Sequence, residues 1–429
     1  MTPEVKQRIE QIQQGIVPKG YKKTKSDIVP VDWKESPIGK YIREYTEKTT
    51  IPNQYPVLTS ARTGLMLQTD YYSNRQVTTE NNVGYNVLPY GYITFRSRSD
   101  DGRFRFNENR IIERGIISYF YPVFSFSEEV CHEYMLYLLN FSIYRRMYPY
   151  AEGTAQQVLS LKKLGQLKYS LPLVAEQKKI AKILSTQDKA IELQARKIEE
   201  LKRFKKGCLE KMFPRKGQKV PEKRFPGFTD DWEQRKLVSL CEKFTDGDWI
   251  EAKDQSHSGV RLIQTGNVGS GEYIDKPSNK KWISEETFRR LNCEEVFAGD
   301  ILISRLPEPA GRACIVPNLG IKMITAVDCT IVRTATKTNS KYLLQFLSSQ
   351  SYFDEVNTCL VGGTRQRISR SNLAAFDVPI PAKYEEQKAI GEFLCGIDHL
   401  ITLHQRKLEE MKNQKKALMQ LLLTGIVRI

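Results

Sequence analysis

The tripeptide Glu-Gln-Lys occurs twice in the sequence, and its Glu-x-Lys pattern is one that metal-dependent nucleases use. It stands at Glu176 to Lys178 and again at Glu386 to Lys388, 210 positions apart. A nuclease of this kind also needs an acidic metal ligand on an upstream strand hairpin. Each tripeptide here opens a long helical pattern, where the partial positive charge of a helix N-terminus favours a glutamate. The pattern therefore predicts a helix start, and a nuclease remains the alternative from the enzyme class.

Other catalytic signatures are missing from the sequence. There is no GxxxxGK[ST] phosphate loop, no GxGxxG after a strand pattern, and no [DNS]PP[YFW] tetrapeptide of the kind that holds the target amine in adenine methyltransferases. The eight cysteines have neither CxxC spacing nor a nearby histidine in a zinc-like arrangement, which predicts free thiols and no metal site. We expect a chain without catalysis and without a cofactor of its own.

The charge balance points to an anionic partner. Lysine and arginine number 66 against 50 acidic residues, which gives a formal net charge of +16. An excess of this size favours nucleic acid first and a membrane surface second. The longest apolar run, from Gly115 to Phe126, is broken by Pro122 and is too short to span a bilayer. Residues 1–15 are charged and do not resemble a signal peptide, so we expect a cytoplasmic protein.

The two tripeptides belong to a repeat that covers nearly the whole chain. RKIEELKRFKK from Arg196 matches RKLEEMKNQKK from Arg406, and GTAQQV from Gly153 matches GTRQRI from Gly363, all at an offset of 210. The offset falls to 199 at the Asp-Trp pairs that end at Trp33 and Trp232, as expected if loops differ in length. The sequence predicts two copies of one unit, each a globular part of about 130–150 residues followed by a helix of about 40.

Both helical segments carry an apolar heptad seam. Its residues are Leu184, Ile191, Ile198 and Leu201 in the first copy, and Leu394, Ile401, Leu408 and Met411 in the second. A period of seven predicts a coiled coil, and antiparallel pairing would return the second helix to the first globular part with pseudo-two-fold symmetry. Each helix would span about 60 Å. Gln194 and His404 fall within the seam, where polar residues fix register.

The globular parts are predicted to mix helices and strands. Each opens with its Asp-Trp pair, whose tryptophan is expected to anchor the first strand, and short β-rich runs follow. One helix is expected near 128–147 in the first copy and near 340–357 in the second. The fold class is therefore α+β. The Gly-Thr loops at Gly153 and Gly363 would either seat a phosphate or form the turn that aims the long helix.

Basic and aromatic residues gather in loops between the predicted strands. Arginine, lysine and glutamine in such loops suit phosphate and base-edge contacts, although the same composition suits any exposed loop. The candidate DNA-binding residues are Arg96, Arg98, Arg103, Arg105, Arg110 and Gln156 in the first copy, and Lys280, Lys281, Arg305, Arg312, Arg365 and Arg367 in the second.

This layout resembles the specificity subunit of a type I restriction–modification system. The resemblance rests on the Trp-led segments DWKESPIG and RFPGFTDDWEQRKL, a Gly-Thr-x-Gln loop in each copy, and the helix starts LPLVAEQKKI and IPAKYEEQKAI, each followed by a long helix. It covers nearly the full length of the chain. The second helix start departs from the first by one extra residue between Pro381 and Glu386.

The resemblance implies an organisation and a set of partners. Target recognition domains would occupy 28–170 and 217–380, after an N-terminal segment at 1–27, and spacer helices would occupy 171–216 and 381–429, the latter with the C-terminal tail. Each domain would read one half of a bipartite site in double-stranded DNA, and the paired helices would set the gap. Two methyltransferase subunits that use S-adenosylmethionine would dock on the helices, and restriction subunits that use ATP and Mg would join them. A coiled-coil adaptor that binds proteins through its globular ends is the alternative.

Overall fold

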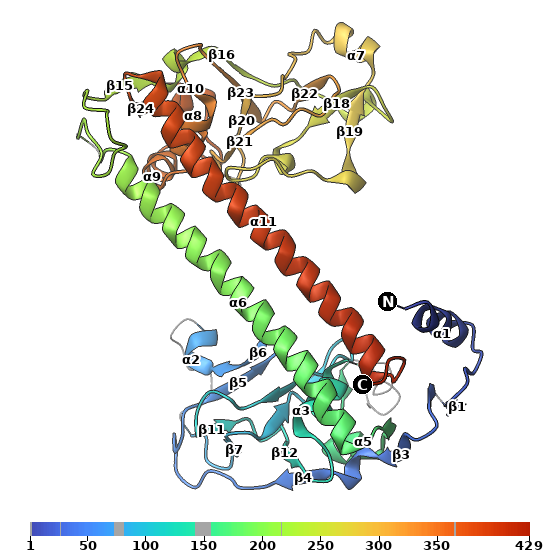
Figure 1. The fold of residues 1–429 in the computed structure, drawn as a ribbon. Coiled ribbons are helices and arrows are strands. Elements are labelled where there is room, and N and C mark those ends of the chain that lie inside the picture. Colours follow the sequence, from blue (N-terminus) through green and yellow to red (C-terminus); the bar gives the residue numbers. More distant parts are fainter. Residues whose placement is uncertain (1, 26, 73–80, 142–155, 216, 364–365) are drawn as a thin grey trace. The chain divides into compact units, whose positions relative to one another are not determined.

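The computed structural model describes residues 2–25, 27–72, 81–141, 156–215, 217–363 and 366–429 (Figure 1). The chain divides into two compact units. Unit 1 comprises residues 1–193 and 408–429, and unit 2 comprises residues 194–407. Two long helices, α6 (Val174–Met212) and α11 (Tyr384–Leu423), each contribute one part to unit 1 and the other part to unit 2. Neither helix contains a proline, which is consistent with their length.

Unit 1 is built on an antiparallel sheet of four strands with the order β10–β8–β12–β4. Phe95, Phe106 and Phe124 from this sheet form an aromatic core, with ring centroids 4.7–6.5 Å apart. The four strands are β4 (Ile42–Tyr45), β8 (Ile93–Phe95), β10 (Phe106–Glu108) and β12 (Val123–Phe126). The remaining strands form pairs: β1 (Tyr21–Lys23) with β2 (Ile28–Pro30), β3 (Lys34–Pro37) with β14 (Lys168–Leu171), β5 (Leu58–Ala61) with β6 (Gly64–Leu67), β7 (Asn86–Pro89) with β11 (Arg114–Ile117), and β9 (Arg98–Ser99) with β13 (Gln157–Val158). The shorter helices are α1 (Pro3–Gln13), α2 (Gln68–Tyr71), α3 (His132–Phe141) and α5 (Leu161–Gln166).

Unit 2 contains two four-stranded sheets. The first is antiparallel and has the order β21–β20–β23–β16, and the second has the order β17–β19–β18–β22 with a parallel pair between β18 and β22. The strands are β16 (Cys241–Asp246), β17 (Gln255–Ser256), β18 (Val260–Ile263), β19 (Lys281–Ile283), β20 (Ile301–Ser304), β21 (Ala313–Ile315), β22 (Met323–Thr325) and β23 (Cys329–Thr334), with β15 (Glu233–Lys236) and β24 (Asp377–Ile380) as a separate pair. The helices are α7 (Glu285–Arg290), α8 (Ser340–Phe346), α9 (Gln350–Thr358) and α10 (Arg370–Ala375).

The two units share a framework and differ in what is added to it. Strands β10, β8, β12 and β4 of unit 1 follow the same order as β21, β20, β23 and β16 of unit 2. In both units the strand after the Asp-Trp pair joins the strand before the long helix, as β3 with β14 and as β15 with β24. Unit 2 has a second four-stranded sheet, whereas the described residues of unit 1 form the two-stranded pairs β5–β6 and β7–β11 in that part of the sequence. The internal repeat is therefore confirmed as a repeat of structure.

The long helices pair antiparallel within each unit. In unit 1, Gln187 donates to the Met411 carbonyl at 3.3 Å, while Leu184, nearer the start of α6, packs in one cluster with Leu422 and Leu423. In unit 2, Gln194 donates to the His404 carbonyl at 2.8 Å and lies 2.9 Å from its Nδ1. The seam residues Leu184, Ile198 and Leu394 are buried, and Ile191, Leu201, Ile401, Leu408 and Met411 are half-buried. The helices begin and end inside the expected ranges 171–216 and 381–429.

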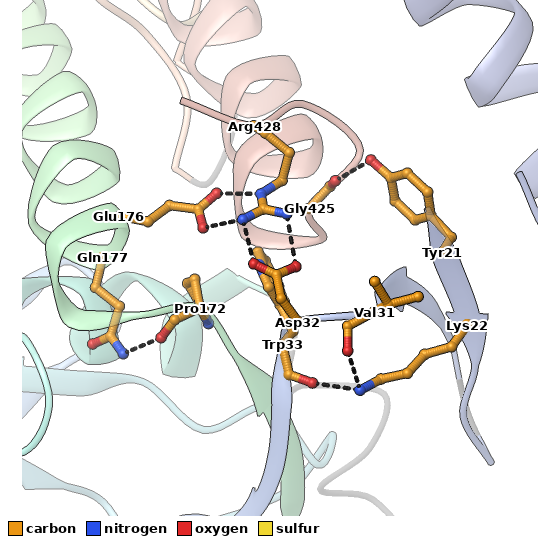
Figure 2. A network of polar contacts seen from close by, with 10 residues as sticks. All are labelled: Tyr21, Lys22, Val31, Asp32, Trp33, Pro172, Glu176, Gln177, Gly425 and Arg428. Carbon is orange, nitrogen blue, oxygen red and sulfur yellow. Dashed lines mark hydrogen bonds and ion pairs between the residues drawn. The ribbon is translucent and has the colours of Figure 1, made fainter. Parts of the chain in front are cut away.

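The glutamate of each Glu-Gln pair is buried and bound by an arginine. In unit 1, Arg428 donates from Nε to Glu176 at 2.6 Å and from Nη2 at 2.8 Å, and it also forms two hydrogen bonds with Asp32 of the Asp-Trp pair (Figure 2). These carboxylates raise the pKa of Arg428, the hydrogen bond with Glu176 being the largest cause. Arg428 therefore joins three parts of unit 1: the start of α6, the segment after α11 and the Asp-Trp turn that precedes β3.

Unit 2 repeats this anchor with an arginine from another segment. Arg224, from the segment that follows α6, donates two hydrogen bonds to Glu386 at 2.6 and 2.8 Å and one to the Asp230 carbonyl at 2.7 Å. Trp232 Nε1 donates to the same glutamate at 3.3 Å. In each unit, the segment after one long helix is thus tied to the start of the other. Both glutamates are occupied by arginine in this way, which argues against a metal-binding role for the Glu-x-Lys pattern.

The glutamine of each pair caps the helix that follows the central sheet. Gln177 Oε1 accepts a hydrogen bond from the Cys131 amide at 2.8 Å, and its Nε2 donates to the Pro172 carbonyl at 2.9 Å (Figure 2). Gln387 makes the matching contacts with the Asn339 amide and the Pro381 carbonyl, at 2.9 and 3.0 Å. A buried amide that donates and accepts in this way satisfies an N-terminal helix group that lacks a backbone partner. The repeated Glu-Gln pair is therefore a structural joint.

A glycine turn allows Arg428 to reach its anchor. Gly425 follows the end of α11 with a φ of +74°, a conformation that favours glycine. A Cβ atom at this position would lie 2.6 Å from Pro30 Cδ and 3.0 Å from the Trp33 ring. The Gly425 carbonyl also accepts a hydrogen bond from the Tyr21 hydroxyl at 2.7 Å (Figure 2). The turn directs the following residues back toward the start of α6.

Substitution of Arg224 by methionine should destabilise unit 2 strongly. The side chain of Glu386 is 1% exposed, and loss of one partner of a buried ion pair costs about 3–5 kcal/mol. Urea unfolding should show this loss in the midpoint of the unit 2 transition. Replacing Arg224 and Glu386 together by methionine should recover most of the loss, because no unpaired charge then remains buried. Equal stability of the single variant and the native chain would contradict an anchoring role.

Candidate nucleic-acid interface

Basic side chains from separate segments of unit 1 line one cleft of about 340 Å³. The turn between β5 and β6 contributes Arg62, and the region that follows β8 contributes Arg96, Arg98, Arg103 and Arg105. Tyr71, Tyr72 and Tyr121 line the same cleft. Guanidinium groups bind phosphates and guanine edges, and tyrosine rings offer stacking surfaces and hydroxyl groups. This arginine cleft is the candidate nucleic-acid interface of unit 1.

Asp101 holds the hairpin and the arginine loop together. Its Oδ1 accepts hydrogen bonds from Arg62 Nη2 at 2.7 Å, from Ser99 Oγ at 2.9 Å and from the Arg103 amide at 3.1 Å. The hydrogen bond from the Arg103 amide is the largest cause that lowers the pKa of Asp101. An ionised carboxylate at this point neutralises part of the local positive charge. It also holds the loop backbone in one conformation, which positions the other arginines of the cleft.

Four of the six candidates in the first copy line the cleft, namely Arg96, Arg98, Arg103 and Arg105. The guanidinium of Arg98 lies 4.6 Å from the centre of the Phe120 ring. Gln156 contacts the rim of the cleft, since its Nε2 donates to Asp100 Oδ1 at 2.9 Å. Arg110 is separate from the cleft lining and forms an ion pair with Glu108 at 2.9 Å.

Two candidates in unit 2 are used inside the protein. Arg312 donates to four backbone carbonyls, those of Thr265, Val268, Leu306 and Pro309, at 2.7–2.9 Å. Arg305 is 6% exposed, donates to the Val327 carbonyl at 2.7 Å and faces Asp246 at 3.4 Å. Both guanidinium groups hold loops in place, which argues against direct contact with DNA bases.

The other candidates of unit 2 lie at the surface. Lys280 is 3.8 Å from Asp275, and Arg367 is 3.4 Å from Asp328 with half of its side chain exposed. Lys281 is half-buried on β19. Arg365 and part of each Gly-Thr loop lie outside the described residues, so the expected role of these loops in phosphate binding stays a prediction.

Sequence reasoning missed several residues of the arginine cleft. Arg62, Tyr71 and Tyr72 lie more than twenty positions before the arginine-rich loop, and Tyr121 lies beyond it. The hairpin itself carried a signal, because Ser-Ala-Arg-Thr-Gly at 60–64 has a turn glycine between two short apolar runs. An arginine at a hairpin turn is exposed, so Arg62 could have been chosen as a candidate from the sequence. The fold is needed to show that Arg62 lies close to the arginine-rich loop that begins at Arg96.

A polar clamp connects each domain to its part of the helix pair. In unit 1, Asp188 on α6 accepts hydrogen bonds from Tyr137 on α3 at 2.6 Å and from Lys415 on α11 at 2.5 Å. In unit 2, Asp398 on α11 accepts them from Gln345 on α8 at 2.9 Å and from Lys205 on α6 at 2.7 Å.

The clamp follows the repeat of the sequence. Asp188 and Asp398 are 210 positions apart, as are Lys205 and Lys415. Burial and the hydrogen bond with Asp188 raise the pKa of Tyr137, burial being the larger cause, so the phenol stays protonated and donates. In each unit the clamp fixes a helix of the domain on the two long helices.

Metal binding finds no support in the part of the chain that the structure describes. The described residues contain no group of three or more histidine, cysteine or acidic side chains that could hold a metal ion. All eight cysteines have free thiols. Among the described residues, no helix has the length and apolar character that crossing a membrane requires.

Several known proteins are similar to this chain. A specificity subunit of the type I restriction enzyme MjaVIII from Methanocaldococcus jannaschii is 27% identical over 293 residues, which are 65% of this chain and 66% of that protein. A putative type I restriction enzyme MjaX specificity subunit from the same organism is 28% identical over 308 residues, which are 69% of this chain and 68% of that protein. The chain thus spans about two thirds of the length of these relatives.

Two solved structures share the fold. The crystal structure of a type I restriction–modification S subunit from M. genitalium matches with a TM-score of 0.57 and 14% identity, over 95% of this chain and 99% of that one. A chain from a study of complex assembly and conformational transition of the type I restriction–modification system matches with a TM-score of 0.55 and 16% identity, over 93% of this chain and 99% of that one.

The family match covers both copies of the repeat. The profile described as "Type I restriction modification DNA specificity domain" matches residues 21–203 and again residues 229–413. Each match includes one globular domain and most of the long helix that follows it. The duplicated framework, its repeated anchors and this double match lead to one conclusion: the chain belongs to the family of type I restriction–modification DNA specificity domains.

Proposed function

We propose that this chain is the DNA-reading subunit of a type I restriction–modification complex, and that each unit reads one half of a bipartite site in double-stranded DNA. The observation that carries the proposal is the repeated framework with unlike surfaces. The central sheets share one strand order, whereas the two-stranded pairs β5–β6 and β7–β11 of unit 1 differ from the second four-stranded sheet of unit 2. A shared framework with different loops suits one task carried out on two different sequences.

The arginine cleft supports phosphate and base contact by unit 1. It combines five arginines with three tyrosines, and among the described residues of its lining one is acidic, Asp100. In unit 2 the exposed residues Lys280 and Arg367, the half-buried Lys281, and Arg365, which lies outside the described residues, remain the candidates from the sequence. Trp249 joins them as a new candidate, since it is 71% exposed on a loop of that unit and an exposed tryptophan offers a stacking surface for bases.

The long helices support docking of two copies of one partner. Unit 1 exposes Ile183 and Leu193, and unit 2 exposes Phe393 and Leu403, which stand 210 positions further on. Exposed apolar residues on a regular helix face are typical of interaction sites. We assign this repeated face to two methyltransferase subunits, and we expect restriction subunits to join that core.

We assign the catalytic steps to the partners. The Glu-x-Lys glutamates bind arginine, and methyl transfer would need S-adenosylmethionine on the methyltransferase subunits. ATP and Mg would be used by the restriction subunits. The chain itself would contribute recognition, spacing and docking.

The experiment that tests this function is co-expression with a type I methyltransferase subunit from the same source, followed by mapping of methyladenine in the genome of the expression host. Methylation confined to a two-part motif with a fixed gap is the expected result. Methyltransferase subunits that bind the chain but methylate no defined motif would contradict its role as the reader. Binding of protein partners alone, without salt-dependent DNA binding, would favour the adaptor alternative.

Replacing Arg96 and Arg98 together by alanine should weaken DNA binding by the assembled methyltransferase about 10- to 100-fold. The slope of log K against log salt should fall by about two if both side chains contact phosphates. Fluorescence anisotropy with a DNA duplex that carries the mapped motif measures both values. Arg110 to alanine is the matched control: this arginine is outside the cleft and paired with Glu108, so its removal should change the affinity less than threefold, by about half a kcal/mol or less.

Lengthening both helices should lengthen the gap of the recognised motif. Four residues inserted after Ala190 and four after Leu400, its counterpart in the repeat, would add about 6 Å to each helix. At about 3.4 Å per base pair, the gap should grow by one or two base pairs while both half-sites stay the same. Methyladenine mapping provides the readout, and an unchanged gap would mean that the helices do not set it.

A further inference from the structure

The apolar face of the long helices differs between the two units. On α6 it follows the seven-residue ladder Ile183, Ala190, Lys197 and Phe204, and on α11 the corresponding ladder is Phe393, Leu400, Lys407 and Gln414. Leu193 and Leu403 stand beside these ladders at equivalent positions. The two copies of the repeat thus have this face at equivalent positions, but several positions differ in the size of the side chain.

Unit 2 carries the larger share of the apolar residues. Phe204, Phe393, Leu400 and Leu403 belong to this unit and are 54%, 38%, 44% and 53% exposed. In unit 1 the described ladder positions hold one large exposed apolar residue, Ile183, together with Ala190 and Gln414, and Leu193 is exposed beside the ladder. Where unit 2 has Phe393, Leu400 and Phe204, the equivalent repeat positions of unit 1 therefore hold Ile183, Ala190 and Gln414.

The face of unit 2 also contains a cleft. It has a volume of about 610 Å³ and is lined by Phe204, Gly207, Cys208, Met212, Phe225 and Phe393. Phe225 packs edge-to-face against Phe393, with ring centroids 5.8 Å apart. Gly207 has no atom within 4 Å of the position of a Cβ, so a partner side chain has room there.

The rim of this cleft is mainly basic. Arg203, Lys211 and Lys223 line it alongside one acidic residue, Glu200. A partner surface with apolar side chains and acidic neighbours would complement this cleft in shape and charge. A nucleic acid backbone would leave the phenylalanine rings exposed, and the apolar lining therefore favours a protein.

We infer that the two docking faces are unequal and that the face of unit 2 binds one methyltransferase subunit more tightly than the face of unit 1 binds the other. The inference rests on the proposed function, which supplies the partner. Aromatic residues seated in a cleft carry a large share of the affinity at protein interfaces. Assembly then passes through a complex with one methyltransferase subunit, which occupies unit 2, before the second subunit joins.

Exchange of residues between repeat positions tests this inference. The variant Phe204→Gln with Leu400→Ala gives unit 2 the residues of unit 1, and the variant Gln414→Phe with Ala190→Leu does the reverse. Titration of the full chain with the methyltransferase subunit, followed by native mass spectrometry, yields the two stepwise dissociation constants. For the native chain we expect the two dissociation constants to differ by about tenfold or more, after correction for the factor that two equal sites would give by statistics alone. The reason is that loss of one aromatic interface residue weakens binding by about this amount.

The first exchange should weaken the tighter constant by about tenfold and remove the excess of the 1:1 complex. The second exchange should strengthen the weaker constant. Urea unfolding of each variant controls for stability, since Phe204, Leu400 and Gln414 are exposed and Ala190 is half-buried. Equal constants in the native chain, or a tighter constant that the first exchange leaves unchanged, would overturn the inference. Absence of any methyltransferase binding would instead overturn the proposed function.

Discussion

The structure depends on two buried glutamates that must be neutralised by arginines from distant segments. Glu176 and Glu386 stand at the start of the long helices, and each is bound by an arginine that follows the end of the other helix, Arg428 and Arg224 respectively. Because a buried carboxylate without a partner is costly, this pairing requires the two helices to run antiparallel in each unit. It also brings the Asp-Trp segment, which leads into β3 in unit 1 and β15 in unit 2, close to the helix start.

The anchors and the clamps leave the variable surfaces free. Glu176, Gln177 and Asp188 form hydrogen bonds with the segment after α11, with α11 itself, and with the start and a tyrosine of α3. Among the described residues, these hydrogen bonds do not involve the arginine loop or the hairpin between β5 and β6, although the charge of Arg105 in that loop interacts with Asp188. Glu386, Gln387 and Asp398 form the equivalent hydrogen bonds in unit 2. A domain can therefore change the residues that face DNA without loss of the contacts that hold it on the helices. This separation fits a protein in which recognition and assembly are carried by different residues.

Patterns with a regular period were predictable, and contacts between distant loops were not. The heptads predicted the two long helices, because a buried helix face requires an apolar residue at regular intervals along the sequence. The constant offset of 210 predicted the repeat. The roles of Arg305 and Arg312 could not be read in the same way, since an arginine that holds four carbonyls has the same sequence context as one that faces solvent. The sequence predicted the arginines of the loop that lines the cleft, but it did not predict Arg62 or the tyrosines. This loop is visible as a run of charges, whereas Arg62 joins it through Asp101, a contact that depends on how the hairpin folds back.

The contact between Gln194 and His404 joins two residues that are copies of one another in the repeat. In a duplicated sequence before any divergence, this position would bring a residue against its own identical counterpart. The pair is unsymmetrical: the Gln194 amide donates to the His404 carbonyl and lies beside the imidazole of the same residue. It requires different residues at the two equivalent positions, and a chain that carries both copies of the repeat can supply them because each copy can change independently of the other.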